Sequence, residues 1–137
     1  MMTKLNPYLS FKDNAREAME FYKGVFGGNL VLTTFKDGGM SKDPNEDTLI
    51  MHSQLDTEHG FTLMGSDTPS YMGEAGKNGS ISLSGEDETE LRGYWDKLVE
   101  GATITQPLVK APWGDTFGMC TDTFGVHWMV NILGKKA

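Results

Sequence analysis

The chain carries one pattern of helix signals twice, and this internal repeat limits the folds open to it more than any other feature. The first copy spans residues 14–28 and the second spans residues 87–101, so a shift of 73 positions superposes them. The matching positions are a capping residue, a glutamate, an aromatic pair and a glycine: Asn14 and Asp87, Glu17 and Glu90, Phe21-Tyr22 and Tyr94-Trp95, and Gly28 and Gly101. Agreement in both order and spacing favours duplication of one structural unit over coincidence.

The first copy lies in a segment that reads as a strand, a helix and three further strands. Apolar residues at helical spacing predict a helix over Ala15–Phe26. Asn14 and Glu17 would open this helix as a capping box, and Gly27-Gly28 would end it. Alternating runs between turn signals predict strands at Leu5–Phe11, Asn29–Phe35, Thr48–Leu55 and Phe61–Ser66.

The second copy repeats this order. Strands are predicted at Gly79–Ser84, Ala102–Gln106, Thr116–Thr121 and Val126–Ile132, around a helix that Asp87 caps and that ends near Gly101. We therefore expect one domain, 1–137, in which modules of about 4–67 and 79–133 are joined by the Gly-, Ser- and Pro-rich linker 68–78. One helix covers only one face of four strands, so the other face must curl around a partner module or a ligand.

Composition narrows the class of protein. Twelve basic and 19 acidic residues give a formal net charge of −7, which repels phosphate backbones and argues against nucleic-acid binding. No apolar run reaches the ~18–20 residues that a membrane span needs, and the N-terminal residues lack the pattern of a secretory signal. The lone Cys120 cannot form an internal disulfide, as suits a reducing compartment. We expect a cytoplasmic protein.

Short motifs near the start, middle and end of the chain point to a known family. They are Pro7-Tyr8-Leu9-Ser10-Phe11, Glu20-Phe21-Tyr22, Phe26-Gly27-Gly28, Leu63-Met64-Gly65-Ser66-Asp67, Trp113-Gly114-Asp115, Asp122-Thr123-Phe124-Gly125 and Trp128-Met129-Val130-Asn131. In this order the chain resembles the PhnB-like branch of the vicinal oxygen chelate superfamily, which groups glyoxalases, bleomycin-resistance proteins and dioxygenases.

This resemblance implies an α+β fold, in which two tandem βαβββ modules form a cupped mixed sheet with the helices on its outer face. It also implies a homodimer. It does not select one activity, because lyases, dioxygenases, epimerases and antibiotic-resistance proteins share the fold.

The resemblance also indicates where metal-dependent members place one His or Glu on each of four strands. The corresponding positions here are Asn6, Met64, Ser80 and Met129. An amide, a hydroxyl and two thioethers are poor donors for the divalent ions that prefer carboxylate or imidazole ligands. We therefore expect no metal and no other cofactor; a divalent metal at a relocated site is the alternative.

Strand alternation sorts the side chains between the helix and the cavity. The positions expected to face the cavity are Asn6, Tyr8, Ser10, Thr62, Met64, Ser80, Ser82, His127, Met129 and Asn131, with Trp113 at its mouth. This lining contains hydroxyl, amide, imidazole and thioether groups but no carboxylate, and Asp115 is its nearest expected charge. Such a wall suits a neutral or mildly polar organic ligand.

Two histidines are the candidates for catalysis. His52 lies mid-strand with Gln54 on the same face, and His127 shares a face with Met129 and Asn131. Either imidazole could act as an acid or base or as a relocated metal ligand, although a strand histidine is more often structural. Cys120 reads as a small buried hydrophobe rather than a nucleophile.

Two functions follow from these residues. The first is binding of a small organic molecule without metal, and the alternative is a lyase, isomerase or dioxygenase-like enzyme that uses His52 or His127.

Overall fold

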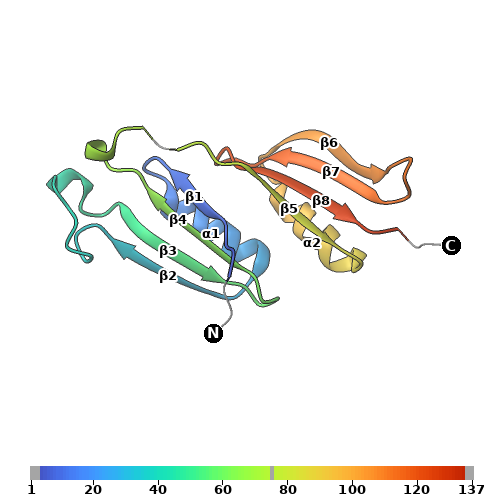
Figure 1. Cartoon of the computed structure of the whole chain (residues 1–137), viewed down its shortest axis with the longest axis horizontal. Helices are drawn as coiled ribbons and strands as arrows, with labels where there is room; N and C mark the ends of the chain where they lie inside the picture. The colour runs from blue at the N-terminus through green and yellow to red at the C-terminus, as the bar shows by residue number, and fades with distance from the viewer. Residues whose placement is uncertain (1–3, 75, 135–137) are drawn as a thin grey trace. The chain divides into compact units, whose positions relative to one another are not determined.

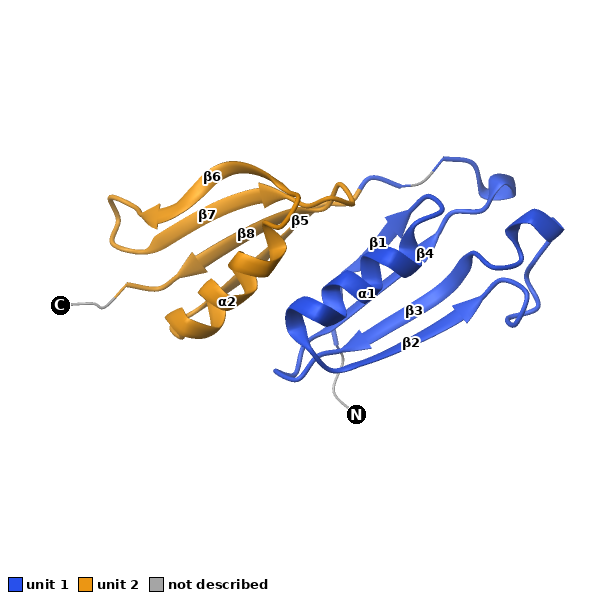
Figure 2. Ribbon diagram, turned by 180° about the vertical axis from the view of Figure 1, so that it is seen from behind, with its two compact units in different colours: residues 1–77 blue, residues 78–137 orange. Residues whose placement is uncertain are grey.

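The computed structural model describes residues 4–74 and 76–134. The chain divides between Lys77 and Asn78 into two compact units, drawn in blue and orange in Figure 2. Each unit contains one four-stranded sheet and one long helix, in the order strand, helix and three strands (Figure 1). The predicted α+β fold of two tandem βαβββ modules is confirmed.

The first unit places its helix across one face of a mixed sheet (Figure 1). Its elements are β1 Tyr8–Phe11, α1 Ala15–Phe26, β2 Asn29–Thr34, β3 Ile50–Asp56 and β4 Thr62–Asp67, with short 3-10 helices at Pro44–Glu46 (η1) and Ser70–Met72 (η2). The strand order is β1-β4-β3-β2. Strands β1 and β4 are parallel, and the other neighbours are antiparallel.

The second unit repeats this topology. Its elements are β5 Ser80–Gly85, α2 Glu88–Leu98, β6 Thr103–Lys110, β7 Thr116–Thr121 and β8 His127–Ile132. The strand order is β5-β8-β7-β6, again with a parallel pair formed by the first and last strands. No helix among the described residues is long and apolar enough to cross a membrane.

Helix α1 begins and ends where its periodicity predicts. Its buried residues recur every three or four positions and so form one stripe: Ala15, Ala18, Met19, Tyr22, Val25 and Phe26. The sheet contributes alternate strand residues to the same core, among them Leu9, Phe11, Leu55 and Leu63. The opposite sheet face therefore carries the intervening side chains.

The two helices are capped by different means. Asp87 accepts a hydrogen bond from the Glu90 N–H at 3.0 Å, as predicted for the second helix. The capping box predicted for the first helix is wrong, because the Asn14 side chain makes no capping hydrogen bond. The Ala15 N–H instead donates to the Asp67 carboxylate at 2.9 Å. A buried residue at the end of β4 thus replaces the local cap.

The last hairpin of each unit supports the duplication. The Thr57 N–H donates to the Phe61 carbonyl at 3.0 Å, and the Asp122 N–H donates to the Val126 carbonyl at 2.9 Å. Both turns contain a glycine with positive φ, Gly60 and Gly125 respectively. The repeat therefore includes turns as well as helices.

The predicted strand limits differ most from the structure at β1 and β6. Strand β1 begins at Tyr8 rather than Leu5, so Asn6 precedes it. Strand β6 continues to Lys110 rather than ending at Gln106, and it contains Pro107. Proline cannot donate a ladder hydrogen bond, but β6 is an edge strand with shifts in its register, where that loss is tolerated.

Candidate functional site

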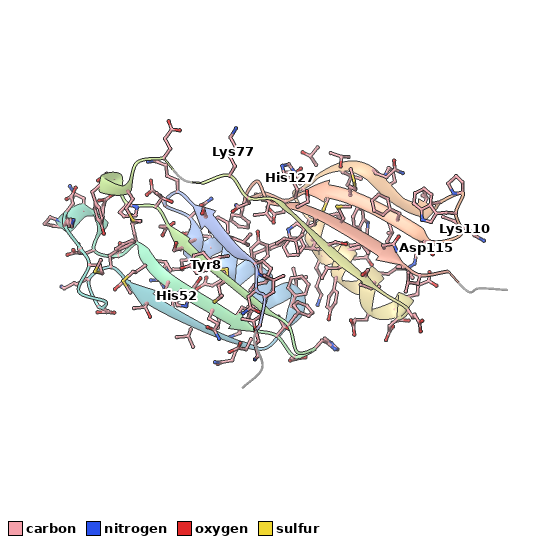
Figure 3. All side chains as sticks on the ribbon, in the orientation of Figure 1. Tyr8, His52, Lys77, Lys110, Asp115 and His127 are labelled. Carbon is pink, nitrogen blue, oxygen red and sulfur yellow. The ribbon has the colours of Figure 1, made fainter. Side chains whose placement is uncertain are left out.

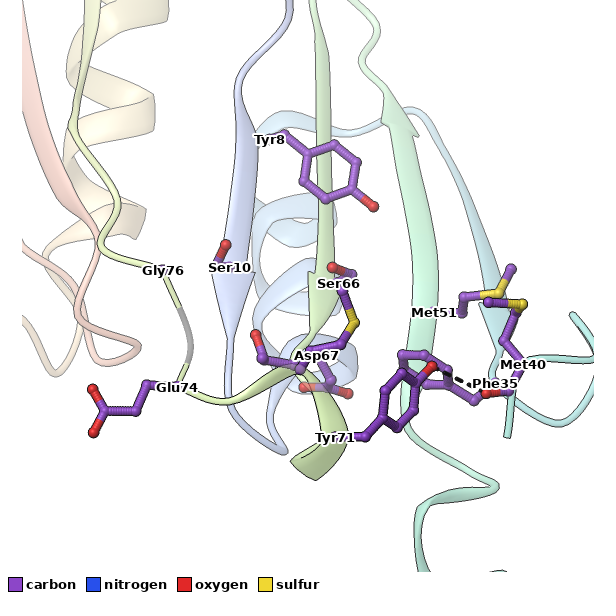
Figure 4. A pocket seen from close by; sticks show the side chains of 12 residues that line it. Tyr8, Ser10, Phe35, Met40, Met51, Ser66, Asp67, Tyr71, Glu74 and Gly76 are labelled. Carbon is purple, nitrogen blue, oxygen red and sulfur yellow. Dashed lines mark hydrogen bonds between the residues drawn. The ribbon is translucent and has the colours of Figure 1, made fainter. Parts of the chain in front are cut away.

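A pocket of about 500 Å³ lies in the first unit, where the ends of β1 and β4 approach the segment that follows β4 (Figure 4). Its lining combines aromatic rings, thioethers, hydroxyls and two carboxylates, contributed by Tyr8, Ser10, Phe35, Met40, Met51, Ser66, Asp67, Thr68, Tyr71, Met72, Glu74 and Gly76. A mostly apolar wall with a few polar groups, at this volume, is typical of a site for a small organic molecule.

The sheet supplies one side of this pocket. Ser10 of β1 and Ser66 of β4 are partners in the parallel ladder, and Tyr8 lies two residues before Ser10 on the same face. Leu9 and Phe11 point to the helix side and are buried. Two of the residues expected to face a cavity, Tyr8 and Ser10, therefore lie in this wall.

The other side is supplied by Met40, from the surface segment 36–49, and by residues of the surface segment 68–74. The Tyr71 hydroxyl donates to the Met40 carbonyl at 3.2 Å, and the Ser70 N–H and hydroxyl both donate to the Glu46 carboxylate at 2.9 Å. The Lys42 ammonium lies 4.3 Å from the centre of the Tyr71 ring. Side-chain contacts thus hold the two segments together.

The sequence analysis did not find these loop residues. Met40 and Met72 lie outside every predicted strand, so strand alternation could not assign them to a cavity. One signal was available, because Tyr71-Met72 places two large apolar side chains in an otherwise Gly-, Ser- and Pro-rich linker. Such residues in a polar connection often have a packing or binding partner.

Asp67 forms a buried anchor at the end of the pocket. It is 4% exposed, and its two carboxylate oxygens accept from the Ala15 and Ile50 N–H groups, each at 2.9 Å. Its charge is therefore balanced by charge-assisted hydrogen bonds and by the N-terminus of α1. This pocket differs from the predicted lining, which contained no carboxylate. Glu74 also lines the pocket, although its side chain points outward in Figure 4.

Tyr8 and His52 form a contact on the open sheet face (Figure 3). The Tyr8 hydroxyl lies 3.0 Å from His52 Nδ1, and the two rings are stacked with their centroids 5.7 Å apart. Among the described residues, His52 makes no second side-chain hydrogen bond. Its Nε2 therefore has no hydrogen-bond partner in the part of the chain that the structure describes.

The other predicted residues of the first unit have separate surroundings. Thr62 donates to the Asp56 carboxylate at 3.0 Å, and Gln54 donates to the same group. Met64 is half-buried and is the ladder partner of Tyr8. Asp56 thus places an exposed carboxylate on the same sheet face as Gln54 and Thr62.

The second unit gathers its predicted residues on β5 and β8. Ser80 is the ladder partner of His127, and Ser82 is the partner of Met129. His127 is exposed, and its Nδ1 lies 2.7 Å from the Thr121 hydroxyl.

Asp115 holds the end of β8. Its carboxylate accepts from the Asn131 amide at 3.0 Å and from the Gly134 N–H at 2.8 Å. Trp113 is 66% exposed in the preceding turn, with its ring 6.2 Å from that of Phe117.

The four positions that the resemblance assigns to metal ligands do not fit a divalent ion. Asn6 and Met64 lie in the first unit, Ser80 and Met129 lie in the second, and none carries a carboxylate or imidazole. In the part of the chain that the structure describes, no three His, Cys, Asp or Glu side chains are grouped to hold a metal. We therefore derive no chemistry through a metal at these positions.

Cys120 lies in the core of the second unit. Its side chain is 1% exposed, and burial, with a smaller contribution from the charge of Asp122, raises the pKa of its thiol to about 11. A thiolate is the reactive form, so this cysteine is a poor nucleophile at neutral pH.

The raised pKa predicts a loss of stability at alkaline pH. A thiol that binds its proton more tightly in the native state stabilises that state fully below pH about 9, and the contribution is lost as pH rises to about 11. Over this range, the urea midpoint of the wild type should fall more steeply than that of a Cys120→Ala variant. Equal slopes for the two proteins would contradict this assignment.

Paired βαβββ units, each with one sheet face left open by its helix, define the class to which this chain belongs. A family model matches residues 4–130, and the chain belongs to the Glyoxalase/Bleomycin resistance protein/Dioxygenase superfamily. The resemblance read from the sequence is confirmed.

Three relatives illustrate the similarity. The structure of protein PA1353 from Pseudomonas aeruginosa is 37% identical with a TM-score of 0.80, and the match covers 96% of this chain and 98% of that one. Protein YjdN of Escherichia coli K12 is 29% identical over 96% of this chain and 97% of its own. A PhnB protein from Bacillus cereus is 23% identical with a TM-score of 0.71, covers 96% and 100% respectively, and shows the fold alone.

Proposed function

We propose that this protein binds a small organic molecule in the pocket of its first unit, without the divalent metal of metal-dependent superfamily members. The pocket itself carries the proposal, because its volume of about 500 Å³ suits such a ligand. The side chains at the four positions that correspond to metal ligands in metal-dependent members are an amide, a hydroxyl and two thioethers. These groups are poor ligands for the usual divalent ions, which supports binding without metal.

The lining indicates the chemistry of the ligand. Tyr8, Phe35 and Tyr71 offer aromatic surface, and methionine side chains offer soft, adaptable contact. The Asp67 carboxylate accepts hydrogen bonds from two backbone groups, and none of the described residues that line the pocket is cationic. A neutral, planar molecule therefore suits this wall better than an anion.

A fluorescent probe tests this proposal. N-phenyl-1-naphthylamine is neutral and aromatic, and its emission rises in apolar surroundings, so we expect saturable enhancement with the wild type. A Ser66→Phe substitution would place a ring in the pocket and should raise the Kd of the probe about tenfold or more, a loss of about 1.4 kcal/mol. Ser84→Phe, on an exposed position of β5 outside the pocket, is the matched control.

Two results would overturn the proposal. The first is equal probe affinity in the wild type and Ser66→Phe, because binding would then lie elsewhere. The second is stoichiometric zinc, nickel, iron or manganese in protein purified without chelators, as measured by elemental analysis.

A further inference from the structure

We infer that Tyr8 and His52 form an acid–base pair beside the pocket, able to remove a proton from a carbon atom of a neutral, planar ligand. This inference rests on the proposed function, because the ligand must first occupy the pocket. The inference goes beyond binding, because it gives Tyr8 and His52 a role in proton transfer.

The position of the pair supports this role. Tyr8 lines the pocket and is 47% exposed, so a ligand can reach its side chain. His52 lies on β3, across β4 from Tyr8, and its Nδ1 is 3.0 Å from that hydroxyl. The rings stack at 5.7 Å, so a ligand that contacts the Tyr8 ring lies next to the imidazole.

The hydrogen bond allows the two residues to act together. When Nδ1 carries the imidazole proton and donates it to the Tyr8 oxygen, His52 Nε2 has a free lone pair and is a base. The Tyr8 O–H can then donate to an oxygen of the ligand. Proton uptake at Nε2 makes the imidazolium, whose Nδ1–H bond to Tyr8 becomes charge-assisted and stronger.

The other two histidines lack this arrangement. His127 is hydrogen-bonded to the aliphatic hydroxyl of Thr121 rather than to a tyrosine. Neither residue lines the pocket of the first unit. His59 is exposed in the hairpin between β3 and β4 and is not part of the pocket wall. His59 is therefore a suitable control for imidazole chemistry at the protein surface.

Ring opening of 5-nitrobenzisoxazole tests for such a base with a neutral, planar probe. His52 Nε2 takes the proton from the ring carbon, the C–H electron pair completes a nitrile, and the N–O bond breaks. The oxygen leaves as a phenolate, which accepts a hydrogen bond from Tyr8, and the imidazolium returns its proton to water. The reaction is an isomerisation without an oxidant or reductant, and its coloured phenolate is measured directly.

We expect the His52→Gln variant to lose about tenfold or more in kcat/KM relative to the wild type, within the range that a positioned base contributes. Tyr8→Phe keeps the aromatic wall but removes the hydroxyl, and it should lose about threefold or more. His59→Gln should retain the wild-type rate. Deuterium at the reacting carbon should slow the wild type, because that C–H bond breaks in the catalysed step.

The possible results distinguish failure of the inference from failure of the proposed function. If 5-nitrobenzisoxazole displaces N-phenyl-1-naphthylamine but His52→Gln retains the wild-type rate, the inference is wrong and the proposed function stands. If 5-nitrobenzisoxazole neither displaces N-phenyl-1-naphthylamine nor reacts, the inference is wrong. If N-phenyl-1-naphthylamine itself shows no saturable binding, the proposed function fails as well. His52→Asn is a second variant, and circular dichroism on each variant separates loss of the base from loss of the fold.

Discussion

An Asp122→Ala substitution should lower the free energy of unfolding by about 4 kcal/mol, a large part of the stability of a small protein. Asp122 is 5% exposed, and its carboxylate accepts from the Phe124 and Val126 N–H groups at 2.8 and 3.0 Å. It also accepts from the indole N–H of the buried Trp128 at 2.9 Å. Alanine would leave three donors without this acceptor, and hydrogen bonds to charged groups are the strong ones.

Two further variants separate this mechanism from a general effect of removing charge. Asp96→Ala removes a carboxylate from the exposed face of α2 and should change stability by less than about 0.5 kcal/mol. Asp122→Asn keeps one acceptor but turns an amide donor toward the Trp128 N–H. Its loss of stability should therefore lie between those of Asp122→Ala and Asp96→Ala. Urea unfolding followed by circular dichroism measures all three. Similar midpoints for Asp122→Ala and Asp96→Ala would show that the hydrogen bonds contribute little.

The regular elements were predictable because their signals are local. Helix α1 occupies the predicted Ala15–Phe26, and β7 occupies the predicted Thr116–Thr121. Both patterns depend on side chains a few positions apart that pack against the same neighbouring element. The predicted limits of β6 were wrong for the complementary reason, since its position at the edge of the sheet allows Pro107 in the strand.

The cap of α1 shows where local reasoning ends. Asn14 and Glu17 satisfy the sequence signature of a capping box, yet the Ala15 N–H is bound by Asp67, 52 residues away. In the second unit, Ile132 takes the corresponding place as the last residue of β8, and Asp87 provides a local cap. The two units share a topology but begin their helices by different interactions.

This difference also concerns the pocket. Asp67 joins the start of α1 to the start of β3, through Ala15 and Ile50, and it lines the pocket of the first unit. Tyr8 and Ser10 could be assigned to that face from strand alternation. Met40 and Tyr71 could not, because they reach the pocket from loops whose positions depend on contacts such as that between Glu46 and Ser70.

Gly28 and Gly101 follow the two helices at equivalent positions of the repeat, but they should respond very differently to alanine. Gly28 has φ +104°, and an added Cβ would lie 2.0 Å from the Asp56 carbonyl oxygen, which is backbone and cannot turn away. Gly101 has φ +70°, and its Cβ would meet only the Thr123 hydroxyl at 2.9 Å, on an exposed turn. We expect Gly28→Ala to cost about 4 kcal/mol and Gly101→Ala about 1 kcal/mol.

Gly24→Ala supplies the matched control for this series, because Gly24 lies within α1 and a Cβ there would meet nothing within 4 Å. Alanine has the higher helix propensity, so this variant should gain about 0.5–1 kcal/mol. Urea midpoints should therefore rank Gly24→Ala above the wild type, then Gly101→Ala, then Gly28→Ala. If Gly28→Ala were no less stable than Gly101→Ala, the turn after α1 could not approach the β3–β4 hairpin as closely as the structure places it. In that case both positions would need glycine only because their backbones have positive φ.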